Sequence, residues 1–128
     1  MYQPYLTYDE YKSMGGTILS SENAISHLKK ASRHIDTLTY NRILKYGFDN
    51  LTDFQKDIIK EVTMSIADFH IENEEVLNTI LKSYSINGVS MSLDGFNVNV
   101  TLKNGVALPA SDYKLLTQTG LTVESFRI

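Results

Sequence analysis

The sequence contains no cysteine, which rules out disulfide bonds and cysteine-based zinc sites. This fits a reducing compartment, or a particle whose assembly does not depend on disulfides. No apolar run approaches the roughly 18 residues that a membrane-spanning helix requires, and the first residues lack the basic segment and apolar core of a secretory signal. We therefore expect a soluble protein that has no membrane partner.

The chain also lacks an excess of positive charge. Its 12 basic and 15 acidic residues give a formal net charge of −3, which argues against a dedicated nucleic-acid binder. The charges are unevenly placed along the chain. Residues 21–46 hold five basic and two acidic residues, and residues 49–76 hold eight acidic and two basic residues. Two interpretations are open: two solvated faces, or a head-to-tail contact in which the basic segment of one subunit meets the acidic segment of the next.

Residues 52–81 predict the helix around which the chain is organised. Thr52 and Gln55 have the spacing of a capping box, and no glycine or proline interrupts the run. Apolar residues recur every third or fourth position, which places them on one helix face; they include Phe54, Ile58, Val62, Ile66 and Phe69. A straight helix of this length would span about 45 Å. We expect either one long helix or a helix that bends near residues 72–75.

Two further helices are predicted before it, over residues 8–14 and about 22–40. The first begins with a capping box at Thr7 and ends at a glycine pair, since glycine readily adopts the left-handed conformation. The second carries an apolar stripe and is expected to be capped by Ser20 or Ser21. The basic residues of this second helix lie mostly off its apolar stripe, which favours a solvent-facing position for them.

After Leu81 the apolar period changes from helical to alternating, which predicts short strands. Asn87 and Gly88 form the strongest hairpin signal, and Asn104 with Gly105 ends the last alternating run. Such short strands need a helical layer or a neighbouring chain to be stable. A last helix is expected over about residues 110–118, with Ser111 as its cap if the helix begins at Asp112.

Together these patterns predict one domain of the α+β class that is mostly α. We expect a bundle of three to four helices around one long central helix, with a small β-hairpin or three-stranded element and a short C-terminal helix. The expected boundaries are residues 7–82 for the helical part, 83–108 for the hairpin region and 109–128 for the last helix and tail.

The sequence offers no catalytic constellation. It has no phosphate-cradling glycine loop and no serine in a nucleophile-elbow motif. His27 and His34 lie two helical turns apart, too far to share a metal ion directly, so surface or edge-of-core histidines are expected. Asp68, Glu72 and Glu75 indicate a solvated acidic face. The pattern therefore predicts no enzymatic activity, no metal site and no cofactor.

Six stretches of the chain resemble the head–tail connector (adaptor, or head completion) proteins of long-tailed bacteriophages that infect Gram-positive bacteria. The resemblance spans almost the whole chain and consists of packing and turn signatures. The stretches are YLTYDEYKSMGG at 5–16, ASRHIDTLTYNRI at 31–43, LTDFQKDIIKEV at 51–62, ADFHIENE at 67–74, SYSINGVSMSL at 83–93 and LLTQTGL at 115–121.

The resemblance implies a structural virion protein at the head–tail interface, present in the host cytoplasm during assembly. Such proteins form homo-oligomeric rings, commonly of about a dozen subunits, and extend the DNA channel from the portal toward the tail. The implied partners are other copies of the chain, the portal protein and the next neck or tail-completion protein. Genomic DNA would pass through the channel without sequence-specific binding.

By analogy with these proteins, the apolar tail and the serine-rich hairpin are the candidate partner interface. The tail is expected either to dock on its own domain or to serve as an arm that grips the portal or a neighbour. The candidate residues are Leu121, Val123, Phe126, Arg127, Ile128, Ile86, Val89 and Met91. The alternative function is a small helical regulatory or DNA-binding module that uses the basic segment 24–45.

Overall fold

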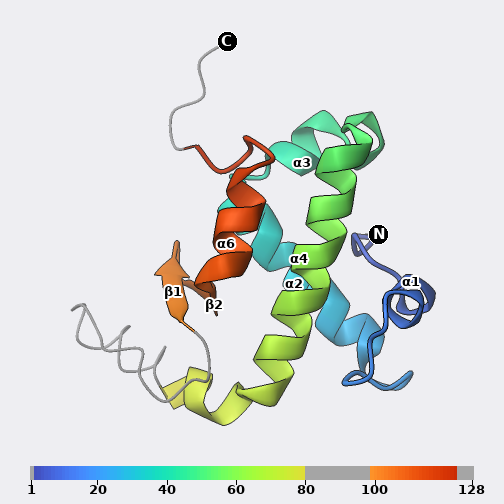
Figure 1. Cartoon of the computed structure of the whole chain (residues 1–128), viewed down its shortest axis with the longest axis vertical. Coiled ribbons are helices and arrows are strands. Elements are labelled where there is room, and N and C mark those ends of the chain that lie inside the picture. The colour runs from blue at the N-terminus through green and yellow to red at the C-terminus, as the bar shows by residue number, and fades with distance from the viewer. Residues whose placement is uncertain (1, 80–98, 124–128) are drawn as a thin grey trace.

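A computed structural model describes residues 2–79 and 99–123 of the chain. It is mostly helical and contains a two-stranded antiparallel sheet, so the predicted class, α+β and mostly α, is confirmed. Figure 1 shows a long helix, α4, standing in front of a second helix, α2, with the small sheet and the C-terminal helix α6 on one side. The predicted hairpin at Asn87 and Gly88 falls outside the described residues.

The long helix α4 spans Asp53–Glu72 and begins at the predicted capping box. The Thr52 hydroxyl accepts a hydrogen bond from the backbone N–H of Gln55 at 3.1 Å. The side-chain oxygen of Gln55 accepts one from the backbone N–H of Thr52 at 3.0 Å. The helix ends before Asn73, whose side chain donates to the Phe69 carbonyl at 2.9 Å, and residues 74–79 are helical again. Of the two predicted forms, the bent one is therefore confirmed.

The N-terminal half contains three helices, α1 over Tyr8–Ser13, α2 over Ala24–Leu38 and α3 over Arg42–Tyr46, followed by a 3₁₀ turn, η1, over Phe48–Asn50. The predicted capping box at Thr7 is present. The predicted serine cap of α2 is wrong, because Asn23 occupies the cap position and makes no side-chain cap bond. Its side-chain oxygen instead accepts from the Ser20 amide at 2.9 Å, which closes the turn that leads into the helix.

Strand β1 (Val100–Lys103) pairs antiparallel with β2 (Val106–Pro109). Asn104 and Gly105 connect them with φ values of 51° and 82°, as a two-residue hairpin turn of type I′ requires. The alternating pattern predicts β1 and the turn that ends it, but it does not predict β2, whose four residues are all buried and do not alternate. The helix α6 (Ala110–Thr117) follows β2 at once, so the predicted cap at Ser111 is also wrong.

The core lies where α4 packs against α2, α6 and β2. It consists mainly of aliphatic side chains that are almost fully buried, and the largest of them are Leu6, Leu28, Ile35, Leu38, Ile43, Ile59, Ile66, Leu108 and Leu116. The predicted apolar stripe of α4 supplies most of its share, although Phe54 at the start of that stripe is exposed.

Tyr11 joins α1 to this core. Its side chain is fully buried, and its hydroxyl donates to Asp68 of α4 at 2.8 Å. The same oxygen accepts bonds from the backbone amides of Ile18 and Leu19, both at 2.9 Å. Gly16 lies against the ring, since a Cβ atom built there would stand 2.3 Å from it. The glycine pair therefore does more than end α1: Gly15 supplies a positive φ, and Gly16 allows the close approach to Tyr11.

We predict that Gly16→Ala lowers the free energy of unfolding by about 1–3 kcal/mol, because the added methyl group overpacks a fixed ring. Urea denaturation monitored by circular dichroism measures this loss. Ser13→Ala, at an exposed position of α1, is the matched control and should change stability by less than about 0.5 kcal/mol. Equal stability of the Gly16→Ala variant and the wild type would contradict the packing described for Tyr11.

Candidate functional site

Three segments that are distant in the sequence meet at one end of the molecule, which we call the α3 end. The Arg42 guanidinium of α3 donates to the Leu121 carbonyl at 2.9 Å. The Gln55 side chain in the first turn of α4 donates to the Thr119 carbonyl at 3.0 Å. These bonds hold residues 119–121, which follow α6, against α3 and the start of α4.

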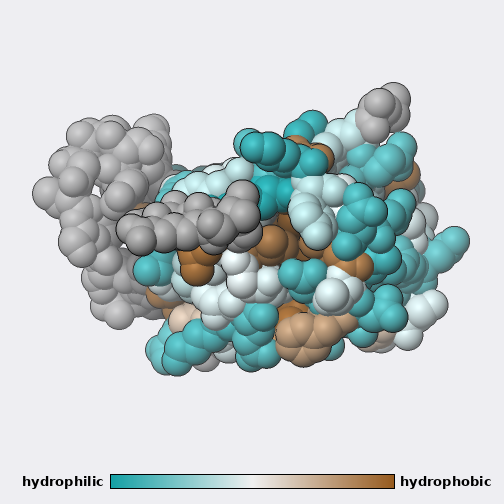
Figure 2. All heavy atoms as spheres, turned by 90° about the horizontal axis from the view of Figure 1, so that it is seen from above, coloured by the Kyte–Doolittle hydropathy of each residue, from teal (hydrophilic) through white to brown (hydrophobic). Residues whose placement is uncertain are grey.

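Large apolar and aromatic side chains are exposed at the α3 end. Their exposed fractions run from 42% for Tyr40 to 64% for Tyr46, and the set is Tyr40, Leu44, Tyr46, Phe54 and Val123. Figure 2 looks down on this end and shows apolar side chains among the polar ones. Exposed apolar side chains gathered in one region are typical of protein–protein contact sites.

The structure places two of the predicted interface residues. Leu121 is 9% exposed and belongs to the chain's own core, and Thr122 beside it is also buried. Val123, the next residue, is 48% exposed. The tail therefore docks on its own domain as far as Thr122. Phe126, Arg127, Ile128, Ile86, Val89 and Met91 lie outside the described residues.

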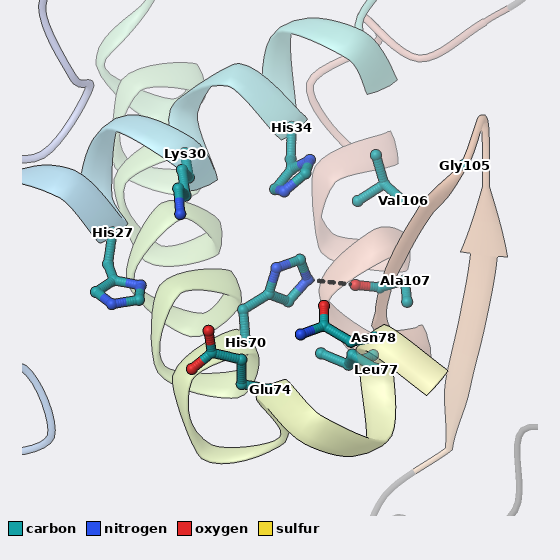
Figure 3. Close-up of a pocket in the computed structure, with 10 residues that line it drawn as sticks. All are labelled: His27, Lys30, His34, His70, Glu74, Leu77, Asn78, Gly105, Val106 and Ala107. Atoms are coloured by element: carbon teal, nitrogen blue, oxygen red, sulfur yellow. Dashed lines mark hydrogen bonds between the residues drawn. The ribbon is translucent and has the colours of Figure 1, made fainter. Parts of the chain in front are cut away.

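A second candidate region is a cavity of about 190 Å³ between α2, the end of α4 and the hairpin turn. Figure 3 shows the imidazoles of His34 and His70 turned toward each other within it, with His27 and Lys30 on the α2 side. The centroids of the two rings are 4.9 Å apart. His70 Nε2 lies 2.7 Å from the Ala107 carbonyl oxygen, which can only accept, so this nitrogen carries the proton.

Both of these histidines favour the neutral form. Burial, followed by the positive charges that His70 and Lys30 can carry, lowers the pKa of His34 to about 4. Burial also lowers the pKa of His70, although its hydrogen bond to Ala107 acts in the opposite direction. Within residues 2–79 and 99–123, no three histidine or acidic side chains are placed to hold a metal ion. The pair therefore links α2, α4 and β2 through neutral ring contacts and one hydrogen bond.

The sequence does not reveal this histidine pair, because its members lie on different helices. Spacing along α2 relates His27 to His34, whereas the contact joins His34 to a residue 36 positions later. The local sequence around His70 carries no signal for it. The contact between His34 and His70 depends on the direction and register in which α2 packs on α4. No short-range sequence pattern encodes that direction or register.

Asp36, the acidic residue of α2, is buried and satisfied by tyrosines of the N-terminal segment. It is 2% exposed, accepts from the Tyr2 hydroxyl at 2.7 Å and also accepts from the Tyr5 hydroxyl. Burial and the Asp36 carboxylate raise the pKa values of both tyrosines, which keeps them protonated as donors. Arg33 lies over the Tyr2 ring with its guanidinium carbon 3.5 Å from the centroid. This cluster fixes the N-terminal segment to α2.

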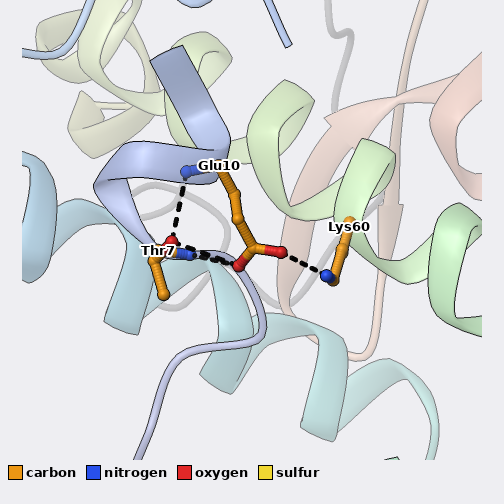
Figure 4. A network of polar contacts seen from close by, with 3 residues as sticks. All are labelled: Thr7, Glu10 and Lys60. Carbon is orange, nitrogen blue, oxygen red and sulfur yellow. Dashed lines mark hydrogen bonds and ion pairs between the residues drawn. The ribbon is translucent and has the colours of Figure 1, made fainter. Parts of the chain in front are cut away.

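Figure 4 shows how Lys60 of α4 is neutralised by Glu10 of α1. Glu10 also accepts from the Thr7 amide at 3.1 Å as part of the capping box. The hydrogen bond from Lys60 and the bonds from Thr7 lower the pKa of the Glu10 carboxyl. One ion pair thus fastens the first helix to the long one and removes a positive charge from the outer side of α4.

No protein-family model, curated protein or solved structure matches this chain. Among the helices of the described part, none has the length and apolar character that a membrane crossing would need. The features that bear on function are therefore those of the chain itself, namely the apolar α3 end and the charged faces of α2 and α4.

We predict that the protein loses stability as the pH falls from about 6.5 toward 5. Because the pKa of His34 is lower in the folded than in the unfolded chain, the unfolded chain takes up a proton first. The loss assigned to His34 over this range is about 2 kcal/mol. Urea denaturation at several pH values measures it, and His34→Gln should flatten the dependence. The same pH dependence in the variant and the wild type would contradict this assignment.

Proposed function

We propose that the protein is a structural component of a bacteriophage neck, where a ring of about a dozen copies joins the portal of the DNA-filled head to the tail and extends the DNA channel. The observation that carries the proposal is the α3 end, where large apolar and aromatic side chains are exposed on segments that the Arg42–Leu121 and Gln55–Thr119 bonds hold together. The sequence resemblance to head–tail connector proteins supplies the class of assembly.

The polar groups of the described residues support a structural role. Asp36, Tyr11 and His70 each make hydrogen bonds that join elements distant in the sequence. Such groups hold the fold, whereas catalytic groups in an active site are aimed at a space that a substrate can enter. We therefore propose that the protein acts by shape and binding, without catalysis.

The proposed partners are other copies of this chain around the ring, the portal on one side and the next neck or tail-completion protein on the other. The site of action is the virion, after assembly in the host cytoplasm. Genomic DNA would pass through the ring without sequence-specific contacts. The α3 end is proposed as the surface that meets a different neck component, because its aromatic and aliphatic residues are those enriched at such contacts.

DNA binding by α2 is the competing function, since Lys30 and Arg33 are exposed on this helix. It requires a DNA affinity that falls steeply with salt, because each phosphate contact releases counterions. A gel shift at low salt separates the two functions. Binding that Lys30→Glu with Arg33→Glu abolishes would favour the DNA-binding module over the neck protein.

We predict that Leu44→Glu weakens attachment to portal-bearing heads by about tenfold or more, because it places a charge within the apolar contact. Leu44 is 49% exposed, so the folded domain should remain stable. Ile18→Glu is the matched control, since Ile18 is 40% exposed and lies outside the α3 end. Complementation of heads that lack the protein measures attachment. Equal effects of the two substitutions would contradict a contact at the α3 end.

We predict that a chain ending at Val123 folds but does not complete infectious particles. The described core, the Arg42–Leu121 bond and the Gln55–Thr119 bond are all retained in this chain. Circular dichroism tests the fold, and the yield of infectious particles tests the arm that residues 124–128 are proposed to provide. A normal yield from the shortened chain would show that this arm is not needed.

A further inference from the structure

The outward face of α2 carries only positive charge. Arg33 is exposed and Lys29 is half-buried, and because they lie four residues apart they stand one above the other on the helix surface. Asp36, which would oppose them, is buried and bonded to Tyr2 and Tyr5. The apolar residues of α2 occupy the opposite side of the helix, where they pack into the core. We call Lys29 and Arg33 the basic face.

The outward face of α4 carries the opposite charge with the same spacing. Asp57 and Glu61 are exposed and also lie four residues apart. Lys60, which lies between them in the sequence, is paired with Glu10 of α1. Within the part of the chain that the structure describes, Asp57 and Glu61 make no ion pair. We call Asp57 and Glu61 the acidic face.

The two faces lie on opposite sides of the subunit. The buried sides of α2 and α4 pack against each other, so their exposed sides point away from each other. Figure 1 shows this arrangement, with α4 in front and α2 crossing behind it. A surface on one side and its complement on the other are what a head-to-tail contact requires, and repetition of that contact closes a ring.

We propose that the basic face on α2 of each copy docks on the acidic face on α4 of the next copy. This inference rests on the ring in the proposed function and names the contact that builds it. The occupant is a second copy of the chain because the two faces are opposite in charge and equal in spacing. An isologous dimer through either face is disfavoured, since it would bring like charges together.

The direction of the helices sets the pairing. In Figure 1, α4 runs downward and α2 runs upward at a slant behind it. Neighbours in a ring of about a dozen copies differ by a rotation of about 30°, so we place α2 of one copy and α4 of the next in opposing senses. Lys29 then meets Glu61 of the next copy, and Arg33 meets its Asp57.

Exposed apolar side chains flank both charged faces. Ile25, four residues before Lys29, is 64% exposed, and Phe54, three residues before Asp57, is 57% exposed. In the antiparallel pairing, Ile25 lies near Met64 of the next copy, which is half-buried in its own chain. The contact therefore combines apolar burial at its ends with two charge pairs, which fix its register and exclude the reversed arrangement.

The test uses sedimentation velocity of the full chain at low salt, over concentrations up to about 1 mM. The basic-face variant carries Lys29→Glu and Arg33→Glu, and the acidic-face variant carries Asp57→Lys and Glu61→Lys. We expect the wild type to assemble beyond a dimer and each variant alone to associate at least about tenfold more weakly. An equimolar mixture of the two variants should recover assembly, because every contact between unlike variants again joins opposite charges.

The control variant carries Lys12→Glu and Lys114→Glu, which change the net charge as much as the basic-face variant does but lie on α1 and α6. It should assemble as the wild type does. A wild type that stays monomeric throughout would overturn the inference. So would full assembly of either face variant, or a mixture of two folded variants that does not recover.

The same variants separate this inference from the proposed function. Assembly that follows the charge rules, in a protein that does not bind portal-bearing heads, would support the contact and contradict the neck role. Normal completion of heads by the basic-face variant alone would contradict the contact and leave the neck role standing.

Discussion

The packing of α2 against α4 is the constraint on which the rest of the structure depends. Leu28 and Ile35 of α2, and Ile59 and Ile66 of α4, are almost fully buried. Each such side chain contributes about 1.5–3 kcal/mol when removed from water. Because the two apolar stripes face each other, the polar side of each helix must face outward. The remaining elements then cover what the pair leaves open, with α6 packed against α4 and β2 packed against both α4 and α2.

Buried polar groups hold the other elements onto this pair. A buried carboxylate is unfavourable unless it is hydrogen-bonded, so Asp36 requires the hydroxyls of Tyr2 and Tyr5 and thereby draws the N-terminal segment across α2. Tyr11 draws α1 onto α4 in the same way, and the hydrogen bond between His70 and Ala107 joins the hairpin to α4. The buried polar side chains of the described core therefore hold its helices and strands in position through hydrogen bonds.

The sequence predicted those features that depend on neighbouring residues. The capping boxes at Thr7 and Thr52 were predicted correctly, because their hydrogen bonds close within four residues. Strand β2 was not predicted because all four of its residues are buried. The alternation of apolar and polar residues that identifies a strand is therefore absent from its sequence. Of the residues named from the sequence as an interface, Leu121 lies in the chain's own core and Val123 is exposed, whereas the surroundings of Leu44 depend on how three distant segments meet.

The separation of charge between the two helices arises from the same packing. Burial of Asp36 removes a negative charge from the surface of α2, and the pairing of Lys60 with Glu10 removes a positive charge from α4. A net charge of only −3 therefore conceals two faces of opposite sign on opposite sides of one subunit. The α3 end adjoins the acidic face, because Phe54 lies one helical turn before Asp57 at the start of α4. In the proposed ring, the contact between copies and the contact with another neck component would therefore be neighbouring surfaces that meet at Phe54.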